Sequence, residues 1–130
     1  MKIILRLFFI FFSFLSFAQI NDSNVNLLIN KISQTEAKGD TTSNDYANLI
    51  NNLAIYYTNK GMYTQAEPLF IKVSTIRKSV YGENHLSYAT SLNNLAFLYQ
   101  KQGRYIEAEP VLLKSLQIEK SILGSDNSDY

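Results

Sequence analysis

The residues most able to do chemistry in this chain are one histidine, a few glutamates and scattered serines. His85 is the only histidine and there is no cysteine, so thiolate chemistry and cysteine-ligated metal sites are excluded. No other metal ligands stand at zinc-site spacing from His85, and no serine lies in a nucleophile-elbow pattern. We therefore predict no catalytic residue, no metal site and no cofactor, and that the protein is not an enzyme.

The composition predicts a single domain with a packed core. The chain has 130 residues, of which 46% are hydrophobic and 18% are charged, whereas a disordered chain carries fewer apolar residues. The formal net charge is +1, and the lysines and arginines do not form a cluster. Because nucleic-acid binding depends on a basic patch, we predict no nucleic-acid partner.

The first 18 residues have the pattern of a secretory signal peptide. Lys2 and Arg6 precede or interrupt an apolar run that continues over residues 7–17, and the small residues Ser16 and Ala18 suit a cleavage site. We predict cleavage after Ala18 and an exported mature protein, either periplasmic or secreted. The run is shorter than the ~20 residues of a membrane-spanning helix. The alternatives are an uncleaved membrane anchor and a buried core helix.

The rest of the chain contains a repeated segment. Residues 46–82 and 88–124 align without gaps, 42 residues apart, and nearly half of the aligned positions are identical. A fixed period of this size is typical of stacked repeat proteins. The shared residues include Tyr46/Tyr88, Asn51/Asn93, Asn52/Asn94, Ala54/Ala96, Tyr57/Tyr99, Gly61/Gly103, Tyr63/Tyr105, Glu67/Glu109 and Pro68/Pro110.

Each copy predicts two helices, helix A and helix B, joined by a short turn. Asp45, Ser87 and Asp129 occupy the same phase and are expected N-caps of helix A, because their side chains accept from free amides. In copy one, Thr64 and Glu67 have the spacing of a capping box for helix B. Glycine is expected to end each helix, because it adopts the left-handed conformation that closes one. These glycines are Gly61, Gly82, Gly103 and Gly124.

Apolar residues at helical spacing predict one buried stripe on each helix. Pro68 and Pro110 are expected in the first turn of helix B, where amides have no helical partner. Because glycine and proline interrupt each copy, antiparallel hairpins are favoured over one continuous coiled-coil helix. The helix A stripes are Ile50, Leu53, Ala54 and Tyr57, and Leu92, Leu95, Ala96 and Tyr99; the helix B stripes are Ala66, Leu69, Phe70, Val73, Ile76 and Val80, and Ala108, Val111, Leu112, Ser115, Ile118 and Ile122.

Residues 19–44 precede the first copy. Val25, Leu28, Ile29 and Ile32 follow helical spacing and predict an amphipathic helix over about residues 24–38. We interpret this helix as an N-terminal cap, since a solenoid needs a polar outer face at its ends. A flexible spacer behind the signal peptide is the alternative. The expected outer face is polar and consists of Asn26, Asn30, Lys31 and Gln34.

The second copy contains the motif Y-A-x-S-L-N-N-L-A-x-L-Y-x-x-x-G-R-Y-x-E-A-E-P. This motif resembles the 42-residue tetratricopeptide repeat of the kinesin-light-chain type. The resemblance implies an all-α, tetratricopeptide-type α-solenoid of antiparallel helix hairpins, with about five helices after the signal peptide. Such repeats usually carry His-Pro before helix A. Here Leu86 follows His85, so a less rigid connector is expected.

In proteins that this sequence resembles, one face of helix A lines a concave groove that receives an extended peptide. By this resemblance, the residues on that face are candidates for binding a protein or peptide ligand. Asparagine suits the role because its amide can both donate and accept hydrogen bonds. Hydrogen bonds between neighbouring repeats and simple solvation are the alternatives. The candidates are Asn51, Ile55, Thr58, Asn59, Asn93, Phe97, Gln100 and Lys101.

The predicted organisation is a signal peptide (1–18), a capping helix and loop (19–44), repeat 1 (45–86), repeat 2 (87–128) and the start of a truncated third repeat (129–130). Helix B of copy two carries Leu113, Leu116 and Leu123 beyond its core stripe. This surplus predicts an uncovered apolar surface, with self-association through the helix as one way to cover it.

The sequence therefore predicts an exported repeat module that binds a protein or peptide through the concave helix A face. One alternative is the N-terminal recognition arm of a larger, truncated multidomain protein, including a protease-like enzyme. Another is a scaffold tethered to the membrane by an uncleaved N-terminus, which is the only membrane contact expected.

Overall fold

The computed structural model of the chain describes residues 23–124, which form a row of helices and contain no strand. An N-terminal helix covers residues 23–37. It is followed by α2 (Asn44–Asn59), α3 (Tyr63–Tyr81), α4 (Leu86–Lys101) and α5 (Tyr105–Leu123). The predicted all-α solenoid is therefore confirmed. None of the helices in this part of the chain is long and apolar enough to cross a membrane.

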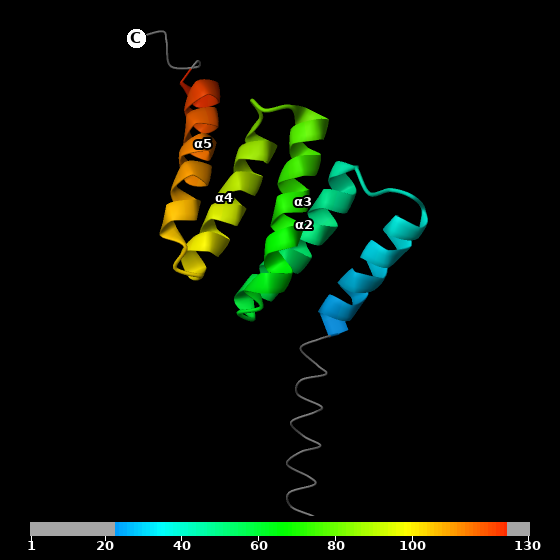
Figure 1. The fold of residues 1–130 in the computed structure, drawn as a ribbon. Coiled ribbons are helices and arrows are strands. Elements are labelled where there is room, and N and C mark those ends of the chain that lie inside the picture. The colour runs from blue at the N-terminus through cyan, green and yellow to red at the C-terminus, as the bar shows by residue number, and fades with distance from the viewer. Residues whose placement is uncertain (1–22, 125–130) are drawn as a thin grey trace, which may run out of the picture.

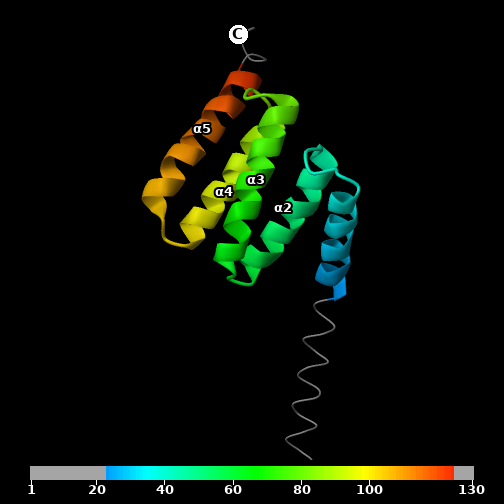
Figure 2. The same ribbon diagram turned by 45° about the vertical axis from the view of Figure 1, so that its right-hand side comes forward.

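Consecutive helices run antiparallel and lie side by side (Figure 1, Figure 2). Helices α2 and α3 form one hairpin, α4 and α5 form the other, and α3 packs against α4 to join them. Helices α2 and α4 are thus helix A of the two copies, and α3 and α5 are helix B. The N-terminal helix stands at one end of the described row and α5 at the other (Figure 1).

Glycine closes the turn inside each hairpin. Gly61 has φ +72° and Gly103 has φ +71°, which are left-handed values that other residues rarely adopt. This conformation lets the next amide reach back to the helix, so Met62 N donates to the Tyr57 carbonyl at 2.8 Å. The predicted helix ends at all four glycines are confirmed, and only Gly124 lacks the left-handed conformation.

The predicted N-caps of helix A are wrong by two residues. Helix α2 is capped by Ser43, whose hydroxyl accepts from Tyr46 N at 3.1 Å, so Asp45 lies in the first turn. Helix α4 is capped by His85, whose Nδ1 accepts from Ser87 N at 3.0 Å. Both helices begin two residues earlier than predicted, because the side chains of Ser43 and His85 accept from the first free amides in place of Asp45 and Ser87.

The predicted start of helix B is also wrong. Helices α3 and α5 begin at Tyr63 and Tyr105, and neither has a side-chain cap. Thr64 therefore lies inside the first turn and cannot form the expected capping box. Pro68 and Pro110 lie beyond the first turn, inside their helices. This is tolerated at Pro68 because Thr64, whose carbonyl loses its helical donor, is exposed to solvent.

Three apolar clusters fill the interior, and they confirm most of the predicted stripes. One lies between the N-terminal helix, α2 and α3, and one lies inside the second hairpin. The third joins the hairpins and contains Ala54, Ala66, Phe70, Leu95 and Leu98. Both alanines are fully buried, so α4 approaches the first hairpin closely. The prediction is wrong for Val80, which lies in the last turn of α3. It is 47% exposed because α3 is longer than α2.

The N-terminal helix packs on the first hairpin. Val25 and Ile32 are buried against α2 and α3, and Leu28 packs beside them, as its amphipathic pattern predicted. Ile29 was expected in the same stripe but is 38% exposed, because it lies toward the edge of the contact face. The four residues of the expected polar face are all exposed. The segment is therefore a helix packed on the first hairpin, and its interpretation as a cap stays a prediction.

Several predictions fall on residues outside 23–124. These are the signal peptide, its cleavage after Ala18, the third N-cap at Asp129 and the start of a third repeat at residues 129–130.

Candidate functional site

Seven of the eight predicted binding residues are at least partly exposed on α2 and α4. We call the surface that they form the helix-A face. Residues 51, 55 and 59 stand one helical turn apart on α2, and residues 93, 97 and 101 stand one turn apart on α4, so each set lies along one side. The helix-A face consists of Asn51, Ile55, Asn59, Asn93, Phe97, Gln100 and Lys101.

Two large apolar side chains of the helix-A face are exposed to solvent. Ile55 is 40% exposed and Phe97 is 48% exposed, and they occupy equivalent positions in the two copies. The core stripes of the same helices are filled by other residues, so the folding of the hairpins does not require these two side chains. Apolar side chains left in water at a recurring position are typical of a surface that contacts another molecule.

Two of the three asparagines of the helix-A face take part in side-chain hydrogen bonds within the protein. Asn94 Nδ2 donates to Asn51 Oδ1 at 3.1 Å, which connects α4 to α2. Asn93 Nδ2 donates to Glu119 Oε1 at 2.9 Å, which connects α4 to α5. Asn93 Oδ1 is buried and has no hydrogen-bond partner among residues 23–124. Asn51 therefore fits the alternative in which the asparagines form hydrogen bonds between neighbouring repeats. Whether a ligand binds Asn51 or Asn93 stays a prediction.

Thr58 is a correction to the predicted set. It is only 7% exposed, and its hydroxyl donates to the Ala54 carbonyl of its own helix at 2.8 Å. A threonine hydroxyl satisfied one turn back in this way has no donor left for a ligand. The equivalent residue in copy two, Gln100, is exposed. The repeat position therefore reaches the surface only in the second hairpin.

The C-terminal ends of both helix A segments carry a cation above an aromatic ring. Lys101 Nζ lies 5.1 Å from the centre of the Phe97 ring, and Lys60 Nζ lies 5.7 Å from the centre of the Tyr56 ring. Such contacts hold a lysine close to the helix surface. Asn59 is exposed at the same end of α2. The helix-A face is thus apolar near its middle and positively charged at this end.

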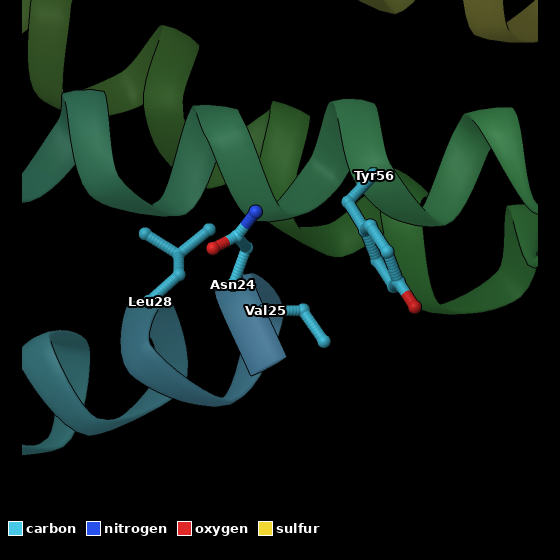
Figure 3. A pocket seen from close by; sticks show the side chains of 4 residues that line it. All are labelled: Asn24, Val25, Leu28 and Tyr56. Carbon is cyan, nitrogen blue, oxygen red and sulfur yellow. The ribbon is translucent and has the colours of Figure 1, made fainter. Parts of the chain in front are cut away.

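A small hollow lies between the N-terminal helix and α2. It measures about 270 Å³ and is lined by Asn24, Val25, Leu28 and Tyr56. Figure 3 shows these side chains between the two helices, with Tyr56 reaching over from α2. The lining is mostly apolar and holds no pair of charged groups, so the hollow has the character of a packing seam between elements.

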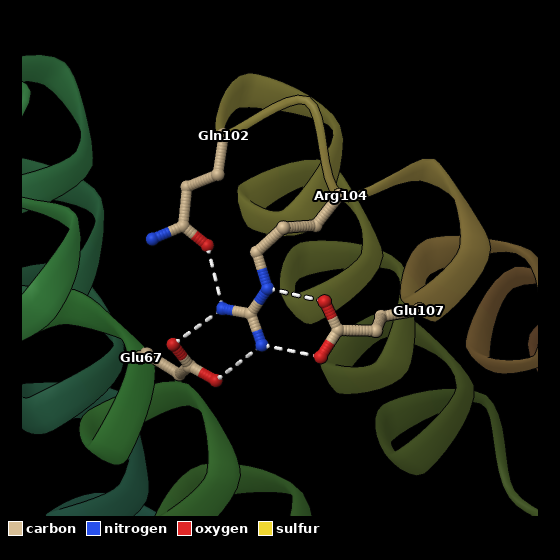
Figure 4. A network of polar contacts seen from close by, with 4 residues as sticks. All are labelled: Glu67, Gln102, Arg104 and Glu107. Carbon is tan, nitrogen blue, oxygen red and sulfur yellow. Dashed lines mark hydrogen bonds and ion pairs between the residues drawn. The ribbon is translucent and has the colours of Figure 1, made fainter.

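The sequence analysis missed Arg104, which forms a polar network between the hairpins (Figure 4). Its guanidinium donates to both carboxylate oxygens of Glu67 in α3, at 2.7 Å and 3.2 Å, and also binds Glu107. It donates to Gln102 Oε1 at 2.8 Å and lies 4.3 Å from the centre of the Tyr99 ring. We call this set the Arg104 network.

The electrostatics of the Arg104 network follow from these contacts. Hydrogen bonds to Glu107 and Glu67 raise the pKa of Arg104 above its ordinary value. In return, the hydrogen bond from Arg104 lowers the pKa of Glu107 below its ordinary value. Arg104 is the arginine of the G-R-Y motif, but sequence reasoning assigned it no role, because copy one has Met62 at the same position and the comparison of copies favours residues that recur.

A second set of contacts lies near the other end of α3. Arg77 is 8% exposed, and its Nη2 donates to Asn48 Oδ1 in α2 at 2.9 Å. Burial lowers the pKa of Arg77 below its ordinary value. Tyr81 stacks on His85, with ring centres 4.3 Å apart and ring planes 11° apart. These contacts join the end of α3 to α2 and to the start of α4.

The part of the chain described in the structure has no group of three or more histidine, aspartate or glutamate residues arranged to hold a metal ion. His85, the one candidate ligand in the sequence, is occupied as the N-cap of α4.

Comparison with known proteins identifies the repeat. A sequence model of the tetratricopeptide repeat family matches residues 45–121, which is more than half of the chain and includes every residue of the helix-A face. No characterised protein matched the sequence. Repeats of this family generally form modules for protein–protein interaction and are typically not enzymes. With its two antiparallel hairpins and this match, the chain belongs to the tetratricopeptide repeat family.

Proposed function

We propose that this protein binds an extended segment of another protein through its helix-A face. The observation that carries the proposal is the exposure of Ile55 and Phe97 at the same position of consecutive repeats. The 42-residue period supports the further assignment to the kinesin-light-chain type of repeat. In the tetratricopeptide proteins that the sequence resembles, this face receives the ligand.

The chemistry of the face defines the kind of peptide that fits it. Ile55 and Phe97 offer apolar contact, so the peptide supplies at least one large apolar side chain. Lys101 and Lys60 favour an acidic group near the C-terminal ends of α2 and α4.

Selection from a random peptide library against the immobilised protein tests the proposal. We expect the enriched peptides to combine an apolar residue with an acidic one. Phe97→Ala should weaken their binding roughly tenfold or more, because exposed aromatic residues are the usual energetic anchors of such surfaces. Lys101→Glu should weaken the binding of the acidic peptides most. The measurement is the dissociation constant of each peptide by fluorescence anisotropy.

Ile71→Ala is the matched control for Phe97→Ala. Ile71 is 43% exposed, which is similar to Phe97, but it lies on α3, outside the helix-A face. Its replacement should leave peptide binding unchanged. If both variants weakened peptide binding equally, or if Phe97→Ala left the dissociation constant unchanged, the peptide would bind elsewhere on the protein.

We further propose that the protein is exported, on the strength of the signal-like pattern in residues 1–18. The mass of the protein purified from the cell envelope or the medium tests this directly. Loss of residues 1–18 is the expected result. An intact N-terminus found in the membrane fraction would instead identify a tethered scaffold.

A further inference from the structure

The outer side of α5 carries four strongly exposed apolar side chains. Ile106 is 89% exposed, Leu113 and Leu123 are each 57% exposed, and Leu116 is 50% exposed. Helix α5 stands at one end of the described row, and no other described element covers its outer side (Figure 1, Figure 2). The exposure of the three leucines confirms the uncovered surface that the sequence predicted.

These side chains form one regular stripe when two charged residues are included. Glu109 and Lys120 are both exposed and make no side-chain hydrogen bond or ion pair with residues 23–124. The spacing along the stripe alternates between three and four residues, which is the spacing of a two-stranded coiled-coil seam. We call these six residues the α5 stripe: Ile106, Glu109, Leu113, Leu116, Lys120 and Leu123.

Two of the four apolar positions of the α5 stripe are not shared by the repeats, whereas Leu113 and Leu123 match Ile71 and Tyr81, which are 43% and 38% exposed. In α3 the positions that match Ile106 and Leu116 hold the polar residues Thr64 and Ser74. The first hairpin folds without apolar side chains at these positions, so the second hairpin does not need them for its own packing. Their presence on the outer side of α5, which no other described element covers, indicates contact with another molecule.

The α5 stripe is complementary to itself. From either end it runs apolar, charged, apolar, apolar, charged, apolar, and the two charges have opposite signs. Two stripes placed antiparallel therefore match in every layer, whereas a parallel pair would set like charges against each other. The antiparallel layers are Ile106 with Leu123, Glu109 with Lys120, and Leu113 with Leu116, each occurring twice.

We propose that α5 pairs antiparallel with α5 of a second copy of this chain, in the register that these layers define. The four apolar layers bury the exposed side chains. The two Glu109–Lys120 layers set the orientation and register, as a polar layer does in a coiled-coil seam. No residue of the α5 stripe belongs to the helix-A face, so this dimer and the proposed function stand on separate observations.

Charge reversal tests the register. Sedimentation of the protein purified from cells expressing the full chain should show twice the mass of one chain. Glu109→Lys alone and Lys120→Glu alone should each raise the dimer dissociation constant roughly tenfold or more, because each places like charges in two layers. Combining the two changes restores opposite charges in both layers and should return the dissociation constant to near the wild-type value.

Lys31→Glu is the matched control for Lys120→Glu. It makes the same change of charge on an exposed residue of the N-terminal helix, far along the row from α5, and should leave the dimer unchanged. Circular dichroism of each variant confirms that the helices are retained. A wild-type protein that stays monomeric at every concentration, or a double variant no better than the single ones, would overturn the proposal. A monomer that binds a helix of a different protein would also overturn it.

Cross-linking provides a second, independent test. The sequence has no cysteine, so introduced cysteines are the only thiols. A mixture of Leu113→Cys and Leu116→Cys chains should cross-link with a short thiol-reactive reagent faster than either variant alone. Faster cross-linking of each variant with itself would indicate a parallel pair and exclude the proposed register.

Discussion

Replacing Phe70 with alanine is expected to lower the free energy of unfolding by about 3–5 kcal/mol, in the range for large buried aromatic residues. Phe70 is 2% exposed and belongs to the cluster that joins the two hairpins. Its neighbours there include Leu95 and Leu98 from α4. The truncation leaves a cavity at the one apolar contact between the repeats, where two fully buried alanines already bring the backbones close.

Urea denaturation followed by circular dichroism measures this effect. Ile71→Ala is the matched control, because Ile71 is the next residue of the same helix and is 43% exposed. We expect Ile71→Ala to lower the free energy of unfolding by only about 0.5 kcal/mol, as for most surface substitutions. An unfolding midpoint that is the same for both variants would mean that the hairpins do not depend on this contact. A Phe70→Ala transition that splits into two steps would show the hairpins unfolding separately.

Tyr46→Ala should lower the free energy of unfolding by a similar amount, about 3–5 kcal/mol. Tyr46 is 1% exposed and packs in the cluster shared by the N-terminal helix, α2 and α3. Its hydroxyl donates to Glu36 Oε1 at 2.6 Å and accepts from Lys72 Nζ at 2.8 Å. One side chain therefore connects three helices through both its ring and its hydroxyl. Thermal and urea melts of the variant measure the loss.

Tyr46→Phe separates the hydroxyl from the ring and should cost only about 1 kcal/mol, the usual net value of such hydrogen bonds. Burial, with a smaller contribution from Glu36, raises the pKa of Tyr46 above its ordinary value of 10.0. The contribution of this group is thus fully present below about pH 10 and is lost as the pH rises through its folded-state pKa. Tyr46→Phe should reduce the alkaline loss of stability.

The control for Tyr46→Phe is the equivalent tyrosine of copy two. Tyr88 is 6% exposed, and its hydroxyl makes no hydrogen bond to residues 23–124. Tyr88→Phe should leave the unfolding midpoint nearly unchanged. If Tyr46→Phe and Tyr88→Phe changed the unfolding midpoint equally, the hydrogen bonds of Tyr46 to Glu36 and Lys72 would contribute nothing to stability.

The helices could be predicted because their signals are local and repeated. Apolar spacing and the closing glycines identified all four helices of the two hairpins and most of their buried residues. Helix starts could not be placed in the same way, since they depend on the shape of the preceding loop. Ser43, for example, is positioned by Asp40, whose carboxylate accepts from the Ser43 amide and hydroxyl at 3.1 Å and 2.6 Å. Sequence spacing alone favoured Asp45.

The candidate site was predicted only in outline. Helical phase placed Ile55 and Phe97 correctly on the exposed side of helix A, because exposure follows the position around the helix. The same reasoning failed for Thr58, whose buried hydroxyl is satisfied within its own helix. Arg104 was missed because its role depends on residues brought together from α3 and α5. A contact between distant segments cannot be predicted from one sequence by comparing its repeats when the repeats carry different residues at the contact position.

The junction between the hairpins is held near both ends of α3. The Arg104 network joins α3 to the second hairpin near the start of α3. The Tyr81–His85 stack and the contact from Arg77 Nη1 to the Ser87 carbonyl, at 3.5 Å, join them near its end. Two separated points of attachment resist twisting of one hairpin against the other better than a single point does. Under the proposed function, these contacts preorganise the surface that receives the peptide, so that little of the binding free energy is spent on ordering the protein.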